Sequence, residues 1–136
     1  MAEKSLDFYC GRIRRQVRRT RQYVLHARRF TKEMWPRGTF GPQVGVASVL
    51  LRVLDTAEDM VREPGSWWSG RPEEMVLASC GPIATAMHRF ADEAARRSVM
   101  RYSAFERAKM KRHVDAWDQI VRAAQRLTAM RKLGAA

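Results

Sequence analysis

Residues 11–32 constrain the fold most strongly, because they combine a helical hydrophobic period with an uninterrupted positive charge. Apolar and small residues recur there at alternating steps of four and three, which is typical of a helix with one core-facing side. Within the segment and on either side of it, these residues are Leu6, Cys10, Ile13, Val17, Thr20, Val24, Ala27, Thr31 and Met34. Residues 11–32 also hold eight Arg, one Lys and one His, and no acid. The segment predicts a long helix with a hydrophobic stripe and a cationic stripe.

The cationic stripe is the first candidate binding surface. At about 100° per residue, most of the basic side chains fall opposite the apolar stripe, and Arg21 falls at the edge. A face that is merely solvated is the plainer interpretation, but such faces usually mix both signs. Uncompensated charge of this kind favours a polyanion as partner, with an acidic protein or a membrane surface as alternatives. The predicted nucleic-acid-binding residues here are Arg12, Arg14, Arg15, Arg18, Arg19, Arg21, His26, Arg29 and Lys32.

The length of 136 residues predicts a single domain, 1–136, that can bury a core without disulfides or a metal. The net charge of +12 is distributed as a basic, an acidic and again a basic region. The acidic region, residues 55–74, holds six carboxylates against two arginines. It would let further copies of the chain associate head to tail; alternatively, these acids cap helices and balance local arginines.

Proline, glycine and capping residues divide the chain into helical segments. Ser5 caps the first helix, which ends near Trp35; a second runs from Pro42 to about Glu63. A third begins at Pro72 and is interrupted at Gly81-Pro82, but its apolar residues keep one phase, which favours a kinked helix over two separate ones. Ser103 and Glu106 form a capping box for the last helix, which ends at about Leu133. The sequence predicts an all-α, up-down bundle of four to five helices with a long basic N-terminal helix.

No pattern typical of catalysis or metal binding is present. His26, His88 and His113 are scattered, and Cys10 and Cys80 each lie on an apolar helix face without metal-ligand spacing. The carboxylate pairs Glu58-Asp59, Glu73-Glu74 and Asp92-Glu93 are merely adjacent in sequence, and nucleophile motifs and phosphate-binding glycine loops are missing. We therefore expect no enzyme activity, no metal and no cofactor. Because no apolar run is typical of a signal peptide or a membrane span, we expect a cytoplasmic protein with no membrane partner.

Two further features are candidate contacts. Trp67 and Trp68 lie in a Gly/Ser loop, where they are candidates for stacking on bases or for a protein interface, or one of them closes the end of the bundle. A second basic cluster leads into the last helix, with Glu106 as its only counterion, and it would form a continuous track if it met the first stripe. The cluster consists of Arg96, Arg97, Arg101, Arg107, Lys109, Lys111 and Arg112.

The small size, positive charge and helix layout of the whole chain resemble those of the small subunits of multi-subunit CRISPR effector complexes. The resemblance implies a helical bundle that contacts RNA or a single DNA strand without catalysis, beside other subunits of a ribonucleoprotein. It also implies strand contacts at Arg14, Arg15, Arg18 and Arg19. The alternative functions are a plasmid or phage accessory protein that binds duplex DNA as a dimer, and an interaction protein that docks on an acidic partner.

Overall fold

Four α-helices make up the part of the chain that the structure, a computed structural model, describes: residues 5–34, 41–63, 68, 70–96 and 104–135. They are α1 (Leu6–Met34), α2 (Gly41–Arg62), α3 (Pro72–Arg96) and α4 (Ala104–Ala135). No strand occurs among these residues. The prediction of an all-α bundle is confirmed.

The helix boundaries agree with the capping signals within one or two residues. Ser5 Oγ accepts a hydrogen bond from the backbone nitrogen of Phe8 at 3.2 Å, as expected for the N-cap of α1. Pro82 lies inside α3, which is one helix, as favoured from its single apolar phase. Helix α4 runs through Gly134 to Ala135, past the predicted end, because glycine tolerates helical backbone angles. The predicted cap Ser103 lies outside the described residues.

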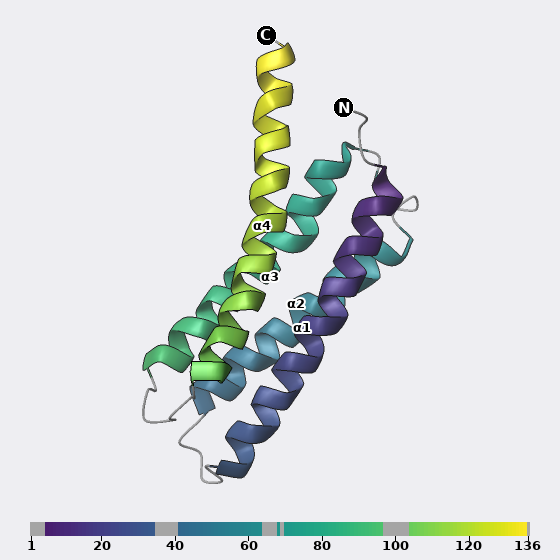
Figure 1. The fold of residues 1–136 in the computed structure, drawn as a ribbon. Helices are drawn as coiled ribbons and strands as arrows, with labels where there is room; N and C mark the ends of the chain where they lie inside the picture. Colours follow the sequence, from purple (N-terminus) through teal and green to yellow (C-terminus); the bar gives the residue numbers. More distant parts are fainter. Residues whose placement is uncertain (1–4, 35–40, 64–67, 69, 97–103, 136) are drawn as a thin grey trace.

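Successive helices run in opposite directions (Figure 1). The closest helix pairs are α3 with α4 and α2 with α3, and α1 packs mainly against α2. Helices α1 and α4 approach each other much less closely, and Figure 1 shows them standing apart along their length. One side of the bundle is therefore bordered by α1 and α4 without close backbone packing between them.

The core consists of the apolar faces that the helical period predicts. Trp117 of α4 and Phe90 of α3 are the largest fully buried side chains, and Ile13 of α1 and Leu50 of α2 are buried with them. Leu6, Leu51, Val114 and Val121 of the predicted faces are partly buried against this core. The described part of the core-facing stripe of α1 is thus used inside the bundle, and the exposed basic side chains of this helix include Arg14, Arg15, Arg18, Arg19 and His26.

Two polar contacts connect α4 to α3. Glu73, which is 2% exposed, forms an ion pair with Arg131, and His88 Nε2 lies 2.8 Å from Asp118 Oδ2. Both contacts connect α4 to α3, the helix with which α4 packs most closely. None of the helices in the described ranges combines the length and the apolar character that crossing a membrane requires.

Candidate nucleic-acid interface

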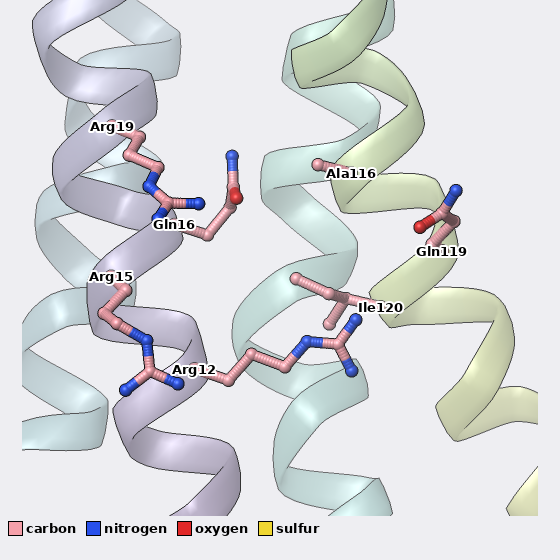
Figure 2. A pocket seen from close by; sticks show the side chains of 7 residues that line it. All are labelled: Arg12, Arg15, Gln16, Arg19, Ala116, Gln119 and Ile120. Atoms are coloured by element: carbon pink, nitrogen blue, oxygen red, sulfur yellow. The ribbon is translucent and has the colours of Figure 1, made fainter.

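Helices α1 and α4 border a groove; Figure 2 shows the part in which arginines of α1 face uncharged side chains of α4, and the basic residues of α4 lie in the other part. It contains two hollows, of about 260 Å³ and about 340 Å³. The first is lined by Arg12, Arg15, Gln16, Arg19, Ala116, Gln119 and Ile120. The second is lined by Arg19, Gln22, Tyr23, His26, Lys109, Arg112 and His113. Arg19 lines both hollows, so they adjoin at this side chain, and together they are called the α1–α4 groove.

Helical spacing explains why these side chains share the groove. On α1, Arg12, Arg15 and Arg19 follow one another at steps of three and four, which places them on one side of the helix. On α4, Lys109 and Arg112 repeat this spacing on the opposite wall. Figure 2 shows the side chains of Arg12 and Gln16 extending from α1 across the groove toward α4. The groove is therefore an open channel between two helix faces, with cations on each.

The charge in the groove is uncompensated. None of the residues that line the two hollows is acidic, and within the described ranges no carboxylate forms an ion pair with Arg12, Arg15 or Arg19. Burial lowers the pKa of His113, and the nearby charges of Lys109, Arg112 and Arg19 lower it further. Cations from both walls thus act on one imidazole. Each hollow far exceeds the roughly 30 Å³ of one water molecule, so this surface suits an anionic group larger than water.

The structure divides the predicted basic residues of α1 into separate groups. Arg12, Arg15, Arg19 and His26 line the groove. Arg14 and Arg18 are exposed but lie toward other sides of the helix, and the charge of Arg18 contributes to a lowered pKa of Glu58 on α2. The groove therefore brings together only part of the cationic stripe.

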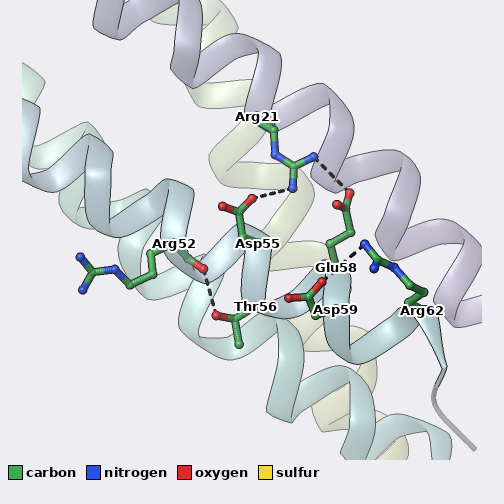
Figure 3. Close-up of polar contacts among 7 residues, drawn as sticks. All are labelled: Arg21, Arg52, Asp55, Thr56, Glu58, Asp59 and Arg62. Carbon is green, nitrogen blue, oxygen red and sulfur yellow. Dashed lines mark hydrogen bonds and ion pairs between the residues drawn. The ribbon is translucent and has the colours of Figure 1, made fainter.

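Arg21 is a correction to the predicted site. Its Nη2 lies 2.8 Å from Asp55 Oδ1 and its Nη1 lies 3.1 Å from Glu58 Oε2, as Figure 3 shows. Its position at the edge of the cationic stripe turns it toward α2, where two acids lie about one turn apart. The hydrogen bond from Arg21 is the main cause of the lowered pKa of Glu58. Arg21 is neutralised within the protein, so we exclude it from the candidate interface.

Substituting Arg21 should affect stability and not binding. We expect Arg21→Gln to lower the free energy of unfolding by about 1 kcal/mol near neutral pH, since the ion pairs are only partly buried. Because folding lowers the pKa of Glu58, this stabilisation is present above the unfolded-state pKa and is lost as the pH falls through the folded-state pKa. Urea unfolding near pH 7 and near pH 3 checks this: the difference from the parent protein should shrink at the acidic pH. An unchanged difference would contradict it.

The second basic cluster contributes to the groove in part. Lys109 and Arg112 line the second hollow together with Arg19, so the expected meeting of the two basic regions occurs at these residues. Lys111 is exposed, but at two positions from Lys109 it lies about 200° around the helix. The predicted residues Arg97 and Arg101 lie outside the described residues, as do the side chains of Arg29, Lys32 and Arg96.

Trp68 and part of the acidic region make contacts within the protein. Trp68 is partly buried against the core and donates a hydrogen bond from Nε1 to the carbonyl oxygen of Arg71 at 3.0 Å, which agrees with an indole that closes the bundle end. Trp67 lies outside the described residues. In the acidic region, Asp55 and Glu58 bind Arg21, and Asp59 lies 3.5 Å from Arg62. These contacts favour the interpretation that the acids of this region balance the charge of nearby arginines. A protein interface at Trp67 and Trp68 stays a prediction.

His113 and the glutamines of the walls line the groove, although they are not among the site residues that the sequence predicts. Thr20, which the sequence places on the core-facing stripe of α1, connects His113 to the core. Its Oγ1 lies 3.0 Å from His113 Nδ1 and accepts a hydrogen bond from Trp117 Nε1 at 2.9 Å. The spacing of Lys109, Arg112 and His113 on one side of α4 was the available signal. It becomes informative only once α1 is known to lie opposite.

The groove offers charge and hydrogen-bond donors and little else. Its arginines, lysine and histidines can bind phosphate or carboxylate groups, and none of its lining residues is a carboxylate that could hold a hard cation. In the ranges that the structure describes, no cluster of three or more His, Cys, Asp or Glu is positioned to hold a metal.

Comparison with protein-family models, curated proteins and solved structures gives no match to this chain.

Proposed function

We propose that this protein is a non-catalytic nucleic-acid-binding subunit of a ribonucleoprotein assembly and that the α1–α4 groove holds the sugar-phosphate backbone. One observation carries the proposal: basic side chains from both helices face one channel that no acid lines. Like charges placed together in this way repel one another, and they are relieved when phosphates replace counterions.

The groove chemistry favours recognition without sequence preference. Arginine side chains bind phosphate oxygens through two parallel hydrogen bonds, which positions a strand without reading its bases. No helix-turn-helix, zinc-finger or RNA-recognition motif occurs in the sequence to supply base contacts. We therefore propose affinity that depends strongly on salt and weakly on sequence.

The assembly we propose is a cytoplasmic complex with several protein subunits, of the CRISPR effector type that the chain resembles in size, charge and layout. The ligand is RNA or single-stranded DNA, and the remaining surfaces contact neighbouring subunits or further copies of the chain. In this role the chain needs no cofactor, because it positions a strand and transforms nothing.

Paired arginine substitutions test the groove. We expect Arg15→Gln/Arg19→Gln to weaken binding of a labelled single strand about tenfold to 1000-fold near 100 mM salt, because two charge-assisted contacts are lost. The slope of log affinity against log salt should become less negative by about 1.4, at about 0.7 per phosphate contact on a single strand. Fluorescence anisotropy with oligouridylate, oligodeoxythymidylate and a duplex of equal length measures both quantities.

Arg14→Gln/Arg18→Gln is the matched control, since it removes the same charge from the same helix outside the groove. It should change the slope little. Equal effects of the two double variants would mean that net charge and not the groove determines binding. Tighter binding of the duplex, with footprinting of one defined site, would favour the duplex-binding alternative. A salt-independent affinity would refute backbone binding altogether.

A further inference from the structure

A buried polar contact joins the core to the second hollow of the groove. Thr20 is fully buried, at 0% exposure, and its Oγ1 accepts a hydrogen bond from Trp117 Nε1 at 2.9 Å. The same oxygen lies 3.0 Å from His113 Nδ1 and accepts a hydrogen bond from Gln16 Nε2 at 3.3 Å. His113 is thus fixed from behind by core residues while it lines the groove.

The donors around Thr20 determine which nitrogen of His113 carries hydrogen. An indole N–H only donates, and so does an amide nitrogen, so Trp117 and Gln16 occupy both lone pairs of the Thr20 hydroxyl. With the Gln16 amide nitrogen turned to Thr20, the hydroxyl hydrogen is directed to His113 Nδ1, and this assignment makes Nδ1 the acceptor. The neutral ring therefore carries its hydrogen on Nε2, as follows from the hydrogen-bond network.

None of the side chains that line the second hollow around His113 is acidic. From α1 these side chains are Arg19, His26 and Tyr23, and the ring of Tyr23 stacks on the imidazole at 4.6 Å between centroids. From α4 they are Lys109 and Arg112, and from α3 the apolar Phe90 packs behind Tyr23. Burial and these cations keep the pKa of His113 below its usual value, so the ring of the free protein is neutral near pH 7.

We propose that the second hollow is a phosphate subsite in which His113 donates from Nε2 to a phosphate oxygen, and that the ring takes up a proton from solvent when a phosphate binds. This inference rests on the proposed function and deepens it. A phosphate places negative charge where the free groove holds only positive charge, which reverses the cause that keeps the ring neutral.

The contacts of Thr20 allow the protonated ring. Nδ1 then donates to the Thr20 oxygen, and the Thr20 hydroxyl turns its hydrogen to the carbonyl oxygen four residues earlier, as helical threonines do. Gln16 gives up its contact, which is the longest of the three. The hydrogen bond from Trp117 is kept, so the core does not change when the groove is occupied.

NMR titration of the histidine ring protons of the full chain tests proton uptake directly. The His26→Gln variant removes the other imidazole of the groove, and His113→Gln and His88→Gln assign the remaining signals. We expect an oligouridylate of about twelve nucleotides to raise the pKa of His113 by about one unit or more, a size ordinary for an anion in contact with an imidazole. His88, bonded to Asp118 on the α3 side, should not respond.

Binding measurements supply the second readout. In the His26→Gln background, affinity for the oligouridylate should rise as the pH falls from about 8 to about 5.5, with a limiting slope of about one proton. With His113→Gln added, the affinity should be weaker near pH 5.5 and nearly independent of pH; circular dichroism checks that this variant is folded.

Two results would overturn the inference and leave the proposed function standing: a His113 pKa that the oligonucleotide does not change, or an equal pH slope after His113→Gln. Absence of oligonucleotide binding at low salt at every pH would overturn both proposals. Inorganic phosphate alone distinguishes the sources of the ligand. A full rise of the His113 pKa with millimolar phosphate, and none with the strand, would remove the strand from this subsite.

Discussion

Arg19→Glu is expected to weaken nucleic-acid binding strongly and, in the same protein, to stabilise the fold. Arg19 is the residue shared by the two hollows, and its charge acts on His113 together with those of Lys109 and Arg112. A carboxylate at this position repels phosphate and attracts the two cations of α4 across the groove. We expect the dissociation constant to rise at least about 100-fold, from the loss of a charge-assisted contact and the added repulsion.

The gain in stability from Arg19→Glu should be small, about 0.5 to 1 kcal/mol, because the position is exposed and screened by solvent. Anisotropy measures the binding, and urea unfolding at low salt measures the stability. Arg14→Glu, with the same change of charge on the same helix, is the control; it should weaken binding less than about tenfold, through its longer-range field alone. If both variants lose binding equally, the groove is not the contact surface.

A binding surface predicts these two opposite effects, a loss of nucleic-acid binding together with a gain in stability. A groove lined by unpaired like charges costs folding free energy, and ion pairs to carboxylates would remove this cost, as Arg21 shows with Asp55 and Glu58 on the same helix. Residues that reduce stability without a compensating contact are typical of binding sites. Arg15 and Arg19 fit that description, and Arg21 does not.

Helical period was enough to predict an all-α bundle, because the described helices bury faces that their spacing of apolar residues marks. Cys10, Ile13, Val17, Thr20 and Val24 of the predicted stripe are all buried. The proline in α3 was also interpreted correctly, since an unbroken apolar phase on both sides of Pro82 favours one helix over two. Local signals determine such features, and they need no knowledge of the neighbouring helices.

Predicting the site required the order of the helices around the bundle, and the helical periodicity of the sequence does not contain this order. The cationic stripe of α1 covers about half of the helix, and of its described side chains Arg12, Arg15, Arg19 and His26 line the groove. Arg21 lies at the edge that faces α2, and acids more than thirty residues away neutralise it. The contact of Thr20 with His113 spans a still larger separation in the sequence, and neither residue type signals it.

The fold should depend most strongly on Trp117, the largest fully buried side chain, so Trp117→Ala is expected to lower the free energy of unfolding by about 3 to 5 kcal/mol. The indole fills the core, and its N–H satisfies the buried Thr20 hydroxyl that supports His113. Urea unfolding followed by helical circular dichroism near pH 7 measures this loss. Since the alanine variant also creates a cavity, its result does not isolate the hydrogen bond.

Trp117→Phe and Thr20→Val isolate that bond, since each removes one partner and keeps much of the packing. Each should cost about 1 to 3 kcal/mol, because a buried polar group is left without its partner, and the double variant should cost less than the sum. Strict additivity would show that the Trp117–Thr20 bond does not contribute to stability. A less-than-additive cost would show that the bond stabilises the contact on which the position of His113 at the groove depends.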